Sequence, residues 1–263
     1  MSLHLLYLPI HTRQLMLCAR EHQLIEGGWS ADLGYLVHSL LARLFGPDAP
    51  KPFDVQEAGG GGEGDPLEIL AYAGADIGAF AAAQNSPDAR ATEALVWAHS
   101  RSKPMPGFGA GQRLGFRVRT CPAVRVGKQH PMFRHGAEVD PYLVQVMRDP
   151  TAPGWDQARR LAVYQEWLAA RLAPAASLET AQLAAMRDAR LWRRGTPRPD
   201  DTMHGRSRLD RAKNGRAPIG RREAVFEGTL TVQDPDAFAA LLARGIGRHR
   251  AFGFGMLLLR LPG

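Results

Sequence analysis

The sequence predicts an α+β fold built from two consecutive units with a similar order of elements. Three observations support this prediction. Segments with alternating apolar residues indicate strands, segments with apolar residues every three or four positions indicate helices, and both kinds follow a comparable order in each half. A hydrophobic share of 45% is ordinary for a globular protein, and 263 residues can bury one large core or two smaller ones.

The first half carries the clearest helix. Leucine and valine recur at helical spacing over 33–45, Asp32 can cap the start, and Gly46 with Pro47 ends the helix. The elements expected in this half are a strand, two helices, a glycine-rich tip, a strand and two short helical pieces: 3–9, 13–23, 33–45, 59–64, 67–72, 75–83 and 92–99. We interpret this half as a βαββα-like unit.

A segment rich in proline and glycine, 101–111, separates the two halves. After it, Leu114, Phe116 and Val118 alternate with glycine and arginine, which predicts a half-buried strand with a basic face over 113–119. The elements expected beyond this strand are two helices, a strand, a helix and a last strand: 139–147, 155–172, 224–232, 235–244 and 252–261. The repeated order predicts two tandem ferredoxin-like, or RRM-like, domains over 1–103 and 104–263.

Positive charge is concentrated in one segment. The net charge of the chain is +7, whereas 190–222 holds eleven Lys or Arg against three acids, a net of +8. A local excess of this kind is an electrostatic footprint for nucleic acid. The alternative is a solvated, disordered basic loop. We expect a basic insertion of helix or loop in this part of the second domain.

The end of the chain combines glycine with basic side chains. Over 245–255, four glycines flank Arg248, His249 and Arg250. Glycine allows positive φ and close approach of a ligand to the backbone, and arginine pairs with phosphate. We interpret this glycine-rich loop as an anion site. A helix C-cap followed by a tight turn is the alternative, while a nucleotide site is disfavoured because no Lys-Ser/Thr follows and a strand comes next.

Several classes of protein are disfavoured by the sequence. No apolar run approaches the roughly 18 residues that span a bilayer, and the apolar N-terminal stretch breaks at Pro9, too early for a signal peptide. Two cysteines, Cys18 and Cys121, form no disulfide framework, so we expect a reducing cytoplasm. No HxxxH or carboxylate cluster has metal-ligand spacing, and we expect neither metal nor other cofactor.

Four stretches, taken in order, resemble a known family. They are Gly34-Tyr35-Leu-Val-His38 with the two leucines beyond it, the region from Lys103 to Arg125, 225–235, and the glycine-rich loop ending Ala-Phe-Gly-Phe-Gly. Together they resemble the CasE (Cse-type) branch of the CRISPR precursor-RNA endoribonucleases in the repeat-associated mysterious protein superfamily. The type IV CRISPR counterpart of that branch is an alternative, because 190–222 is longer and more basic than the usual connection.

This resemblance implies a function. It implies binding of the repeat hairpin of precursor CRISPR RNA and metal-independent cleavage at the 3′ base of the stem, with 2′,3′-cyclic phosphate and 5′-hydroxyl ends. It further implies that the mature guide RNA stays bound and that other CRISPR effector subunits are partners, with no membrane involved. The alternative is a non-catalytic RNA-binding subunit of an effector complex on the same fold.

The resemblance and the residue chemistry together nominate a site. His38 is the first candidate for general acid or base, with Tyr35 one turn earlier, Arg43 on the adjoining face and His249 as a second acid or base. A structural histidine and a surface arginine are the alternatives for His38 and Arg43. The expected RNA-binding residues are basic or glycine: Arg117, Arg119, Arg193, Arg194, Arg206, Arg208, Arg211, Lys213, Arg216, Arg221, Arg222, Gly245, Gly247, Arg248, Arg250, Gly253 and Gly255.

Overall fold

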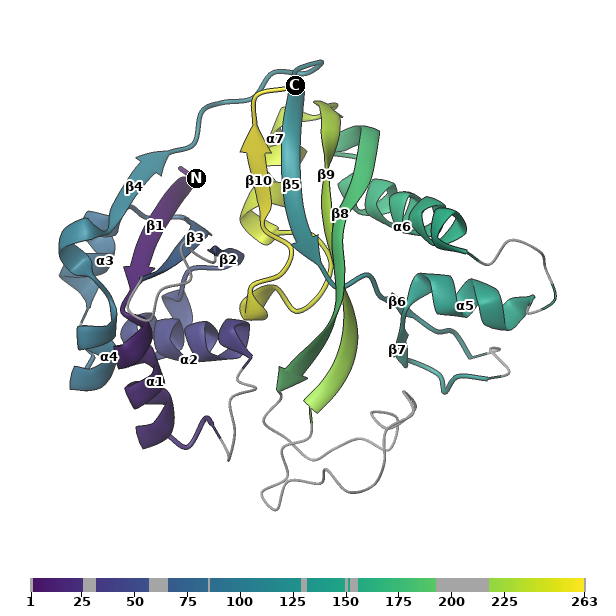
Figure 1. The fold of residues 1–263 in the computed structure, drawn as a ribbon. Coiled ribbons are helices and arrows are strands. Elements are labelled where there is room, and N and C mark those ends of the chain that lie inside the picture. Colours follow the sequence, from purple (N-terminus) through teal and green to yellow (C-terminus); the bar gives the residue numbers. More distant parts are fainter. Residues whose placement is uncertain are drawn as a thin grey trace.

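The protein contains two four-stranded antiparallel sheets, each with helices on one face, and a two-stranded sheet over Val124–Arg125 and Glu138–Val139 (Figure 1). The structure is a computed structural model and describes the following residues: 2–25, 32–56, 66–84, 86–128, 132–149, 151, 156–192 and 218–262. The strand order is β2-β3-β1-β4 in the first sheet and β10-β5-β9-β8 in the second. Counted within its own half, each order is that of a ferredoxin-like sheet, so the predicted fold class is confirmed.

The first half follows the predicted order, with two strands that were not expected, Phe53–Gln56 and Arg101–Pro104. Its elements are β1 His4–Ile10, α1 Thr12–Glu21, α2 Leu33–Phe45, η1 Gly46–Asp48, β2 Phe53–Gln56, β3 Leu67–Ala73, α3 Ile77–Ala83, α4 Ala89–Ala94, η2 Trp97–His99 and β4 Arg101–Pro104. Strand β4 occupies the start of 101–111, which was expected to be a connection. A strand with proline is possible there because β4 lies at the edge of the sheet, beside β1. The division into domains at residue 103 stays a prediction.

The second half contains a long hairpin that the sequence did not reveal. Its elements are β5 Arg113–Thr120, β6 Val124–Arg125, β7 Glu138–Val139, α5 Pro141–Arg148, α6 Gln157–Leu172, β8 Ala176–Trp192, β9 Pro218–Val232, α7 Pro235–Arg244, η5 Arg250–Phe252 and β10 Leu257–Arg260. Strands β8 and β9 pair as far as Trp192 and Pro218, so both flanks of the basic segment are strand rather than helix or loop. The centre of that segment, 193–217, lies outside the described residues.

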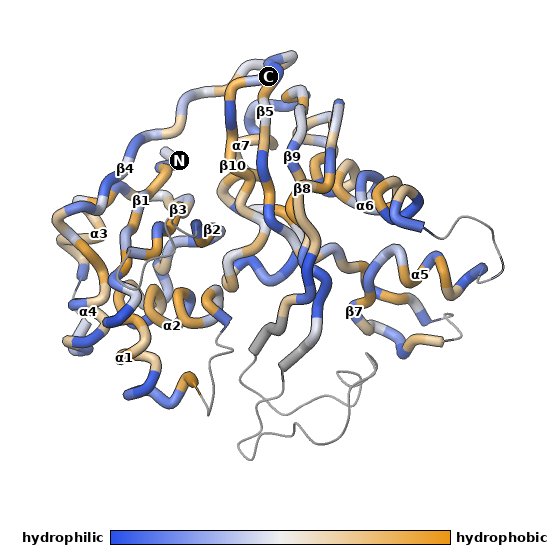
Figure 2. Tube along the Cα trace, viewed as in Figure 1, coloured by the Kyte–Doolittle hydropathy of each residue, from blue (hydrophilic) through white to orange (hydrophobic). Residues whose placement is uncertain are grey.

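Each half buries its own apolar cluster, and the two clusters meet along a seam. Helices α1 and α2 cover the first sheet, while α6 and α7 cover the second, and their buried apolar residues belong to the two clusters. Figure 2 shows apolar and polar positions mixed along α2 and α6. Tyr72 of β3 belongs to the second cluster, and its hydroxyl donates to the Leu257 carbonyl of β10 at 2.9 Å. The seam therefore joins the halves by buried contacts. None of the described helices has the length and apolar character needed to cross a membrane.

Candidate functional site

Helix α2 meets the glycine-rich loop at the seam. A Cβ on Gly34 would lie 2.1 Å from the Phe252 carbonyl oxygen, so only glycine allows this approach. One face of α2 then packs on Phe252, whose ring centroid lies 6.2 Å from that of Tyr35 and 5.3 Å from that of His38. The structure therefore brings the two predicted helix residues against the predicted loop.

The environment of His38 favours a neutral imidazole. Burial is the main cause that lowers the pKa of His38, and the charge of Lys51 lowers this pKa further. A neutral imidazole at pH 7 is able to accept a proton, which a base requires. Tyr35 is 7% exposed, and its backbone N–H donates to the Asp32 carboxylate that caps α2.

The glycine-rich loop is closed on itself by backbone hydrogen bonds. The Ile246 N–H donates to the Gly255 carbonyl at 2.8 Å, and a Cβ on Gly255 would lie 2.1 Å from the Ile246 carbonyl oxygen. The N–H of Gly245 donates to Leu241 and that of Gly255 to Arg119. Gly245 and Gly255 were predicted to bind RNA, but their backbone N–H groups already have hydrogen-bond partners within the chain. The last strand starts at Leu257 instead of 252 because Gly253 and Gly255 have positive φ.

A carboxylate clamps one side of this loop. Glu138 of β7 lies 2.8 Å from the Arg248 guanidinium and 3.4 Å from His249 Nε2, and Arg221 of β9 lies 3.8 Å away. Contact with His249, followed by the charge of Arg248, lowers the pKa of Glu138 to about 2. His249 adopts a left-handed backbone with φ 60° and its side chain is 4% exposed. The carboxylate thus holds the second predicted histidine in place.

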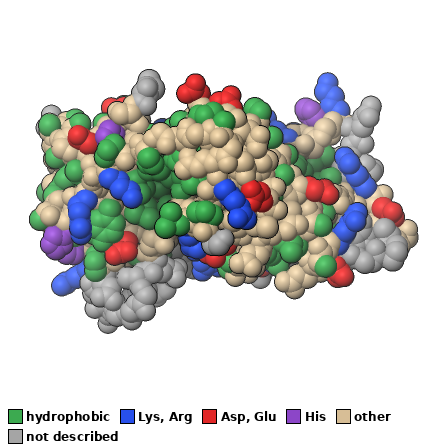
Figure 3. Space-filling model, turned by 90° about the horizontal axis from the view of Figure 1, so that it is seen from above, with side chains coloured by type: hydrophobic (Ala, Val, Ile, Leu, Met, Phe, Trp, Pro, Cys, Tyr) green, Lys and Arg blue, Asp and Glu red, His purple; other side chains and the backbone are tan. Residues whose placement is uncertain are grey.

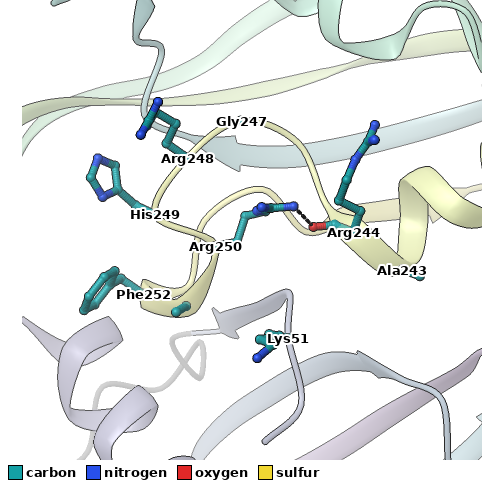
Figure 4. A pocket seen from close by; sticks show the side chains of 9 residues that line it. Lys51, Ala243, Arg244, Gly247, Arg248, His249, Arg250 and Phe252 are labelled. Atoms are coloured by element: carbon teal, nitrogen blue, oxygen red, sulfur yellow. Dashed lines mark hydrogen bonds between the residues drawn. The ribbon is translucent and has the colours of Figure 1, made fainter. Parts of the chain in front are cut away.

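An open pocket of about 690 Å³ lies between the loop and the first half of the chain. Its lining consists of Lys51, Ala243, Arg244, Gly247, Arg248, His249, Arg250, Ala251 and Phe252. In Figure 4, Lys51 lies across from the loop, while the Arg250 guanidinium reaches back to the Arg244 carbonyl, to which it donates at 2.5 Å. None of the described residues that line the pocket carries a carboxylate. Such a pocket has the charge to bind an anion, and the sequence analysis missed Lys51, Arg244 and Phe252 as members of it.

The arginines of β5 have acidic partners. Arg117 lies 3.4 Å from both Asp54 of β2 and Glu227 of β9, and Arg119 lies 2.9 Å from Glu223. Burial is the main cause that raises the pKa of Asp54, to about 6, although both arginines oppose it. On the face shown in Figure 3, described basic and acidic side chains are likewise interspersed. The predicted basic face of β5 is therefore an ion-pair network.

Other predicted residues lie away from the pocket or outside the described chain. Arg43 of α2 donates to Asp88 at 3.4 Å, and Arg222 pairs with Asp188 across the hairpin at 3.2 Å. The remaining predicted RNA-binding residues are not described: Arg193, Arg194, Arg206, Arg208, Arg211, Lys213 and Arg216. Their roles stay predictions.

One group of described side chains has metal-ligand chemistry. Cys18, His22 and Asp88 bring their ligand atoms within 4.8 Å of one another, and a Cys-x-x-x-His spacing on α1 was the overlooked sequence signal. Asp88 already accepts from His22 at 2.7 Å, from Arg43 and from the Ala91 N–H. These contacts explain the group without a metal: Asp88 caps the start of α4 and forms ion pairs with residues of the α1 end and of α2.

Fold and site together define an α+β protein with two ferredoxin-like sheets and a cationic, histidine-bearing pocket at their seam. The chain belongs to the family described as CRISPR associated protein, whose model matches residues 10–260. This result confirms the family suggested by the sequence at the level of a CRISPR-associated protein.

Solved structures share the fold over the whole chain. CRISPR endoribonuclease Cse3 bound to a 19-nucleotide RNA has a TM-score of 0.61 and 19% identity, with 100% of both chains covered. Thermus thermophilus Cse3 bound to an RNA representing a pre-cleavage complex gives 0.56 and 20%, covering 99% of this chain and 100% of that one. A chain of a pre-nicking CRISPR RNA-guided surveillance complex gives 0.51 and 17%, covering 98% and 99%. At these identities the likeness shows the fold alone.

A curated protein matches part of the chain. Acetyl-coenzyme A synthetase of Cupriavidus metallidurans is 30% identical over 135 residues, which are 49% of this chain and 19% of that enzyme. The chain therefore spans about a fifth of the length of the curated relative that it matches. A match of this extent assigns neither family nor activity.

Proposed function

We propose that this protein is an endoribonuclease that binds the repeat hairpin of precursor CRISPR RNA and cleaves at the 3′ base of the stem. The observation that carries the proposal is the convergence of three predicted side chains on Phe252. Tyr35 and His38 come from the first half, and His249, with its ring centroid 6.4 Å from that of Phe252, comes from the second. A cationic pocket adjoins this cluster.

The reaction needs no nucleophile from the protein. The ribose 2′-hydroxyl attacks the adjacent phosphorus, the bond to the 5′-oxygen breaks, and the products carry a 2′,3′-cyclic phosphate and a 5′-hydroxyl. We assign proton transfer to His38, with His249 as the second candidate, and positioning of the RNA to Tyr35. Orientation of the attack and a placed acid or base together account for such catalysis, with the acid or base adding roughly 10²–10⁴-fold.

A second candidate function is a non-catalytic guide-RNA-binding subunit of an effector complex. The likeness to a chain of a surveillance complex favours it. It predicts tight hairpin binding that weakens steeply with salt, without cleavage.

Incubation with the cognate repeat RNA in EDTA separates the two functions. We expect a product with a 2′,3′-cyclic phosphate, and we expect His38→Ala to lower the single-turnover rate roughly 10²–10⁴-fold while the hairpin stays bound. His99→Ala is the matched control, because His99 is exposed on η2 and does not line the pocket. Binding without any cleavage would support the second function.

The pH dependence of the same reaction tests the role of His38. If the imidazole acts as the base, the rate rises with pH with a midpoint below the usual histidine pKa of about 6.5, because burial and Lys51 lower the pKa of His38. If it acts as the acid, the rate instead falls with pH over that same range.

A further inference from the structure

The pocket at the seam draws its positive charge from both halves of the chain. Lys51 precedes β2 in the first half, whereas Arg244 ends α7 and Arg250 begins η5 in the second. Lys51 and Arg244 are exposed, so their charged ends are accessible to a ligand. The pocket therefore exists only where the two halves are held together.

Lys51, Arg244 and Arg250 differ from Arg117 and Arg248 at the seam because they lack acidic partners among the described residues. Among the described residues, no carboxylate lies within the 4.0 Å of an ion pair with Lys51, Arg244 or Arg250, whereas Arg117 and Arg248 each have such a partner. The Arg250 guanidinium is oriented by its hydrogen bond to the Arg244 carbonyl. Oriented cations without a protein counter-charge are suited to phosphate oxygens.

The size of the pocket selects the form of the nucleic acid. A volume of about 690 Å³ is in the range of sites for small ligands, and it suits one or two nucleotides. An A-form stem is contacted from outside, through phosphates and a shallow minor groove, and does not enter a recess of this size. A single strand does, because its backbone is free to bend into the recess.

The pocket lies next to the proposed catalytic histidine. Phe252 lines the pocket and also contacts His38, with ring centroids 5.3 Å apart. Lys51 is near enough for its charge to act on His38. An RNA strand whose scissile phosphate lies at His38 therefore has its next phosphates within reach of the pocket.

We infer that this pocket binds the backbone of the single-stranded RNA that continues beyond the scissile phosphate, on the 3′ side of the repeat hairpin. This assignment rests on the proposed function and adds to it a second contact region, separate from the stem. The RNA ligand is thus held on both sides of the bond that breaks, which aligns the 2′-hydroxyl for attack.

The test compares two RNAs on each protein variant. The first is the cognate hairpin with a 2′-deoxy nucleotide at the attacking position, which prevents cleavage, and the second carries three further 3′ nucleotides. We expect the flank to tighten binding by wild-type protein about tenfold, as for contacts with charged groups. We expect the triple variant Lys51→Ala, Arg244→Ala, Arg250→Ala to lose this flank-dependent gain.

A control of equal charge uses three arginines that have acidic partners. Arg90, Arg113 and Arg260 have side-chain exposures of 47%, 53% and 52%, and each pairs with a glutamate. Their triple replacement by Ala should keep the gain. The double variant Lys51→Ala, Arg244→Ala leaves the loop hydrogen bond of Arg250 intact and serves if the first variant unfolds. For the flanked RNA, the slope of log affinity against log salt should fall by about 0.7 per lost contact.

The outcomes distinguish this inference from the proposed function. An equal flank-dependent gain in the pocket variant and in the control would overturn the inference, and so would a gain that comes only from 5′ nucleotides. Failure of wild-type protein to bind the unflanked hairpin, or to cleave a flanked hairpin that keeps its 2′-hydroxyl at the attacking position, would instead overturn the proposed function.

Discussion

Two groups of basic side chains approach the same seam, and they differ in what faces them. The β5 arginines, Arg117 and Arg119, contact Asp54, Glu227 and Glu223. Of the cations that line the pocket, Lys51, Arg244 and Arg250 contact no carboxylate among the described residues, whereas Arg248 pairs with Glu138. The first group therefore joins strands, and the second has the charge to bind an anion. The comparison shows that partners, rather than position on a basic stretch, decide what an arginine does.

The same contrast exists within the glycine-rich loop. Arg248 and Arg250 are two positions apart, yet Arg248 pairs with Glu138 and Arg250 donates to a backbone carbonyl. The backbone between them turns through the left-handed conformation of His249, which sends the two side chains to different sides. Both arginines line the pocket (Figure 4), but the charge of Arg248 is paired with a carboxylate and that of Arg250 is not.

The largest expected effect tests the structural group. Arg119→Ala should lower the free energy of unfolding by up to about 3 kcal/mol, because Glu223 is buried and would keep only the more exposed Arg187 as counter-charge. Arg244→Ala, which removes an exposed cation without an acidic partner, should leave that free energy within about 0.5 kcal/mol. Urea unfolding of both variants measures the difference. Equal losses would mean that the two groups do not differ in role.

The next effect is the dependence of stability on pH, which has opposite signs at the two carboxylates. The folded pKa of Asp54, raised to about 6 by burial, means that stability falls as pH rises from about 4 to 6. The pKa of Glu138, lowered to about 2, means that stability is lost as pH falls from about 4.5 to 2. Each of these two changes in the free energy of unfolding is at most about 3 kcal/mol.

Thermal unfolding across pH 2–7 checks both signs. Asp54→Asn should remove the decline between pH 4 and 6, and Glu138→Gln should flatten the rise at lower pH. If stability still declines between pH 4 and 6 in Asp54→Asn, another carboxylate is responsible for that decline. Glu223 does not compete for this role, since the guanidiniums of Arg119 and Arg187 outweigh burial and hold its pKa below the usual value.

The smallest expected effect sharpens the comparison at single residues. Arg244→Ala should weaken binding of the flanked hairpin roughly two- to threefold, as its share of the tenfold flank-dependent gain, and lower the salt slope by about 0.7, as for one lost phosphate contact. Arg113→Ala removes a cation of similar exposure that pairs with Glu179 at 2.6 Å and should change neither quantity by as much. Fluorescence anisotropy over a salt series measures both. Identical slopes for the two variants would contradict the assignment of the pocket.

Sequence reasoning reached the fold and part of the site. Leucine periodicity and Asp32 predicted α2 from local signals, and α7 lies where a helix over 235–244 was expected. Strand β8 was missed because its 17 residues alternate poorly and owe their conformation to pairing with β9. Tyr35, His38 and His249 were nominated by resemblance, and the structure places all three around Phe252.

The residues that complete the pocket could not be predicted in the same way. Lys51 and Arg244 are nearly two hundred positions apart, and nothing local distinguishes them from other surface cations. Likewise, Arg117 and Arg119 show a basic face in sequence, while the acids that neutralise them come from β2 and β9. Helical spacing, caps and glycine turns are properties of neighbouring residues, so the chain specifies them directly. Counter-charges and cavities depend on distances between remote segments, which only packing of the two sheets against each other establishes.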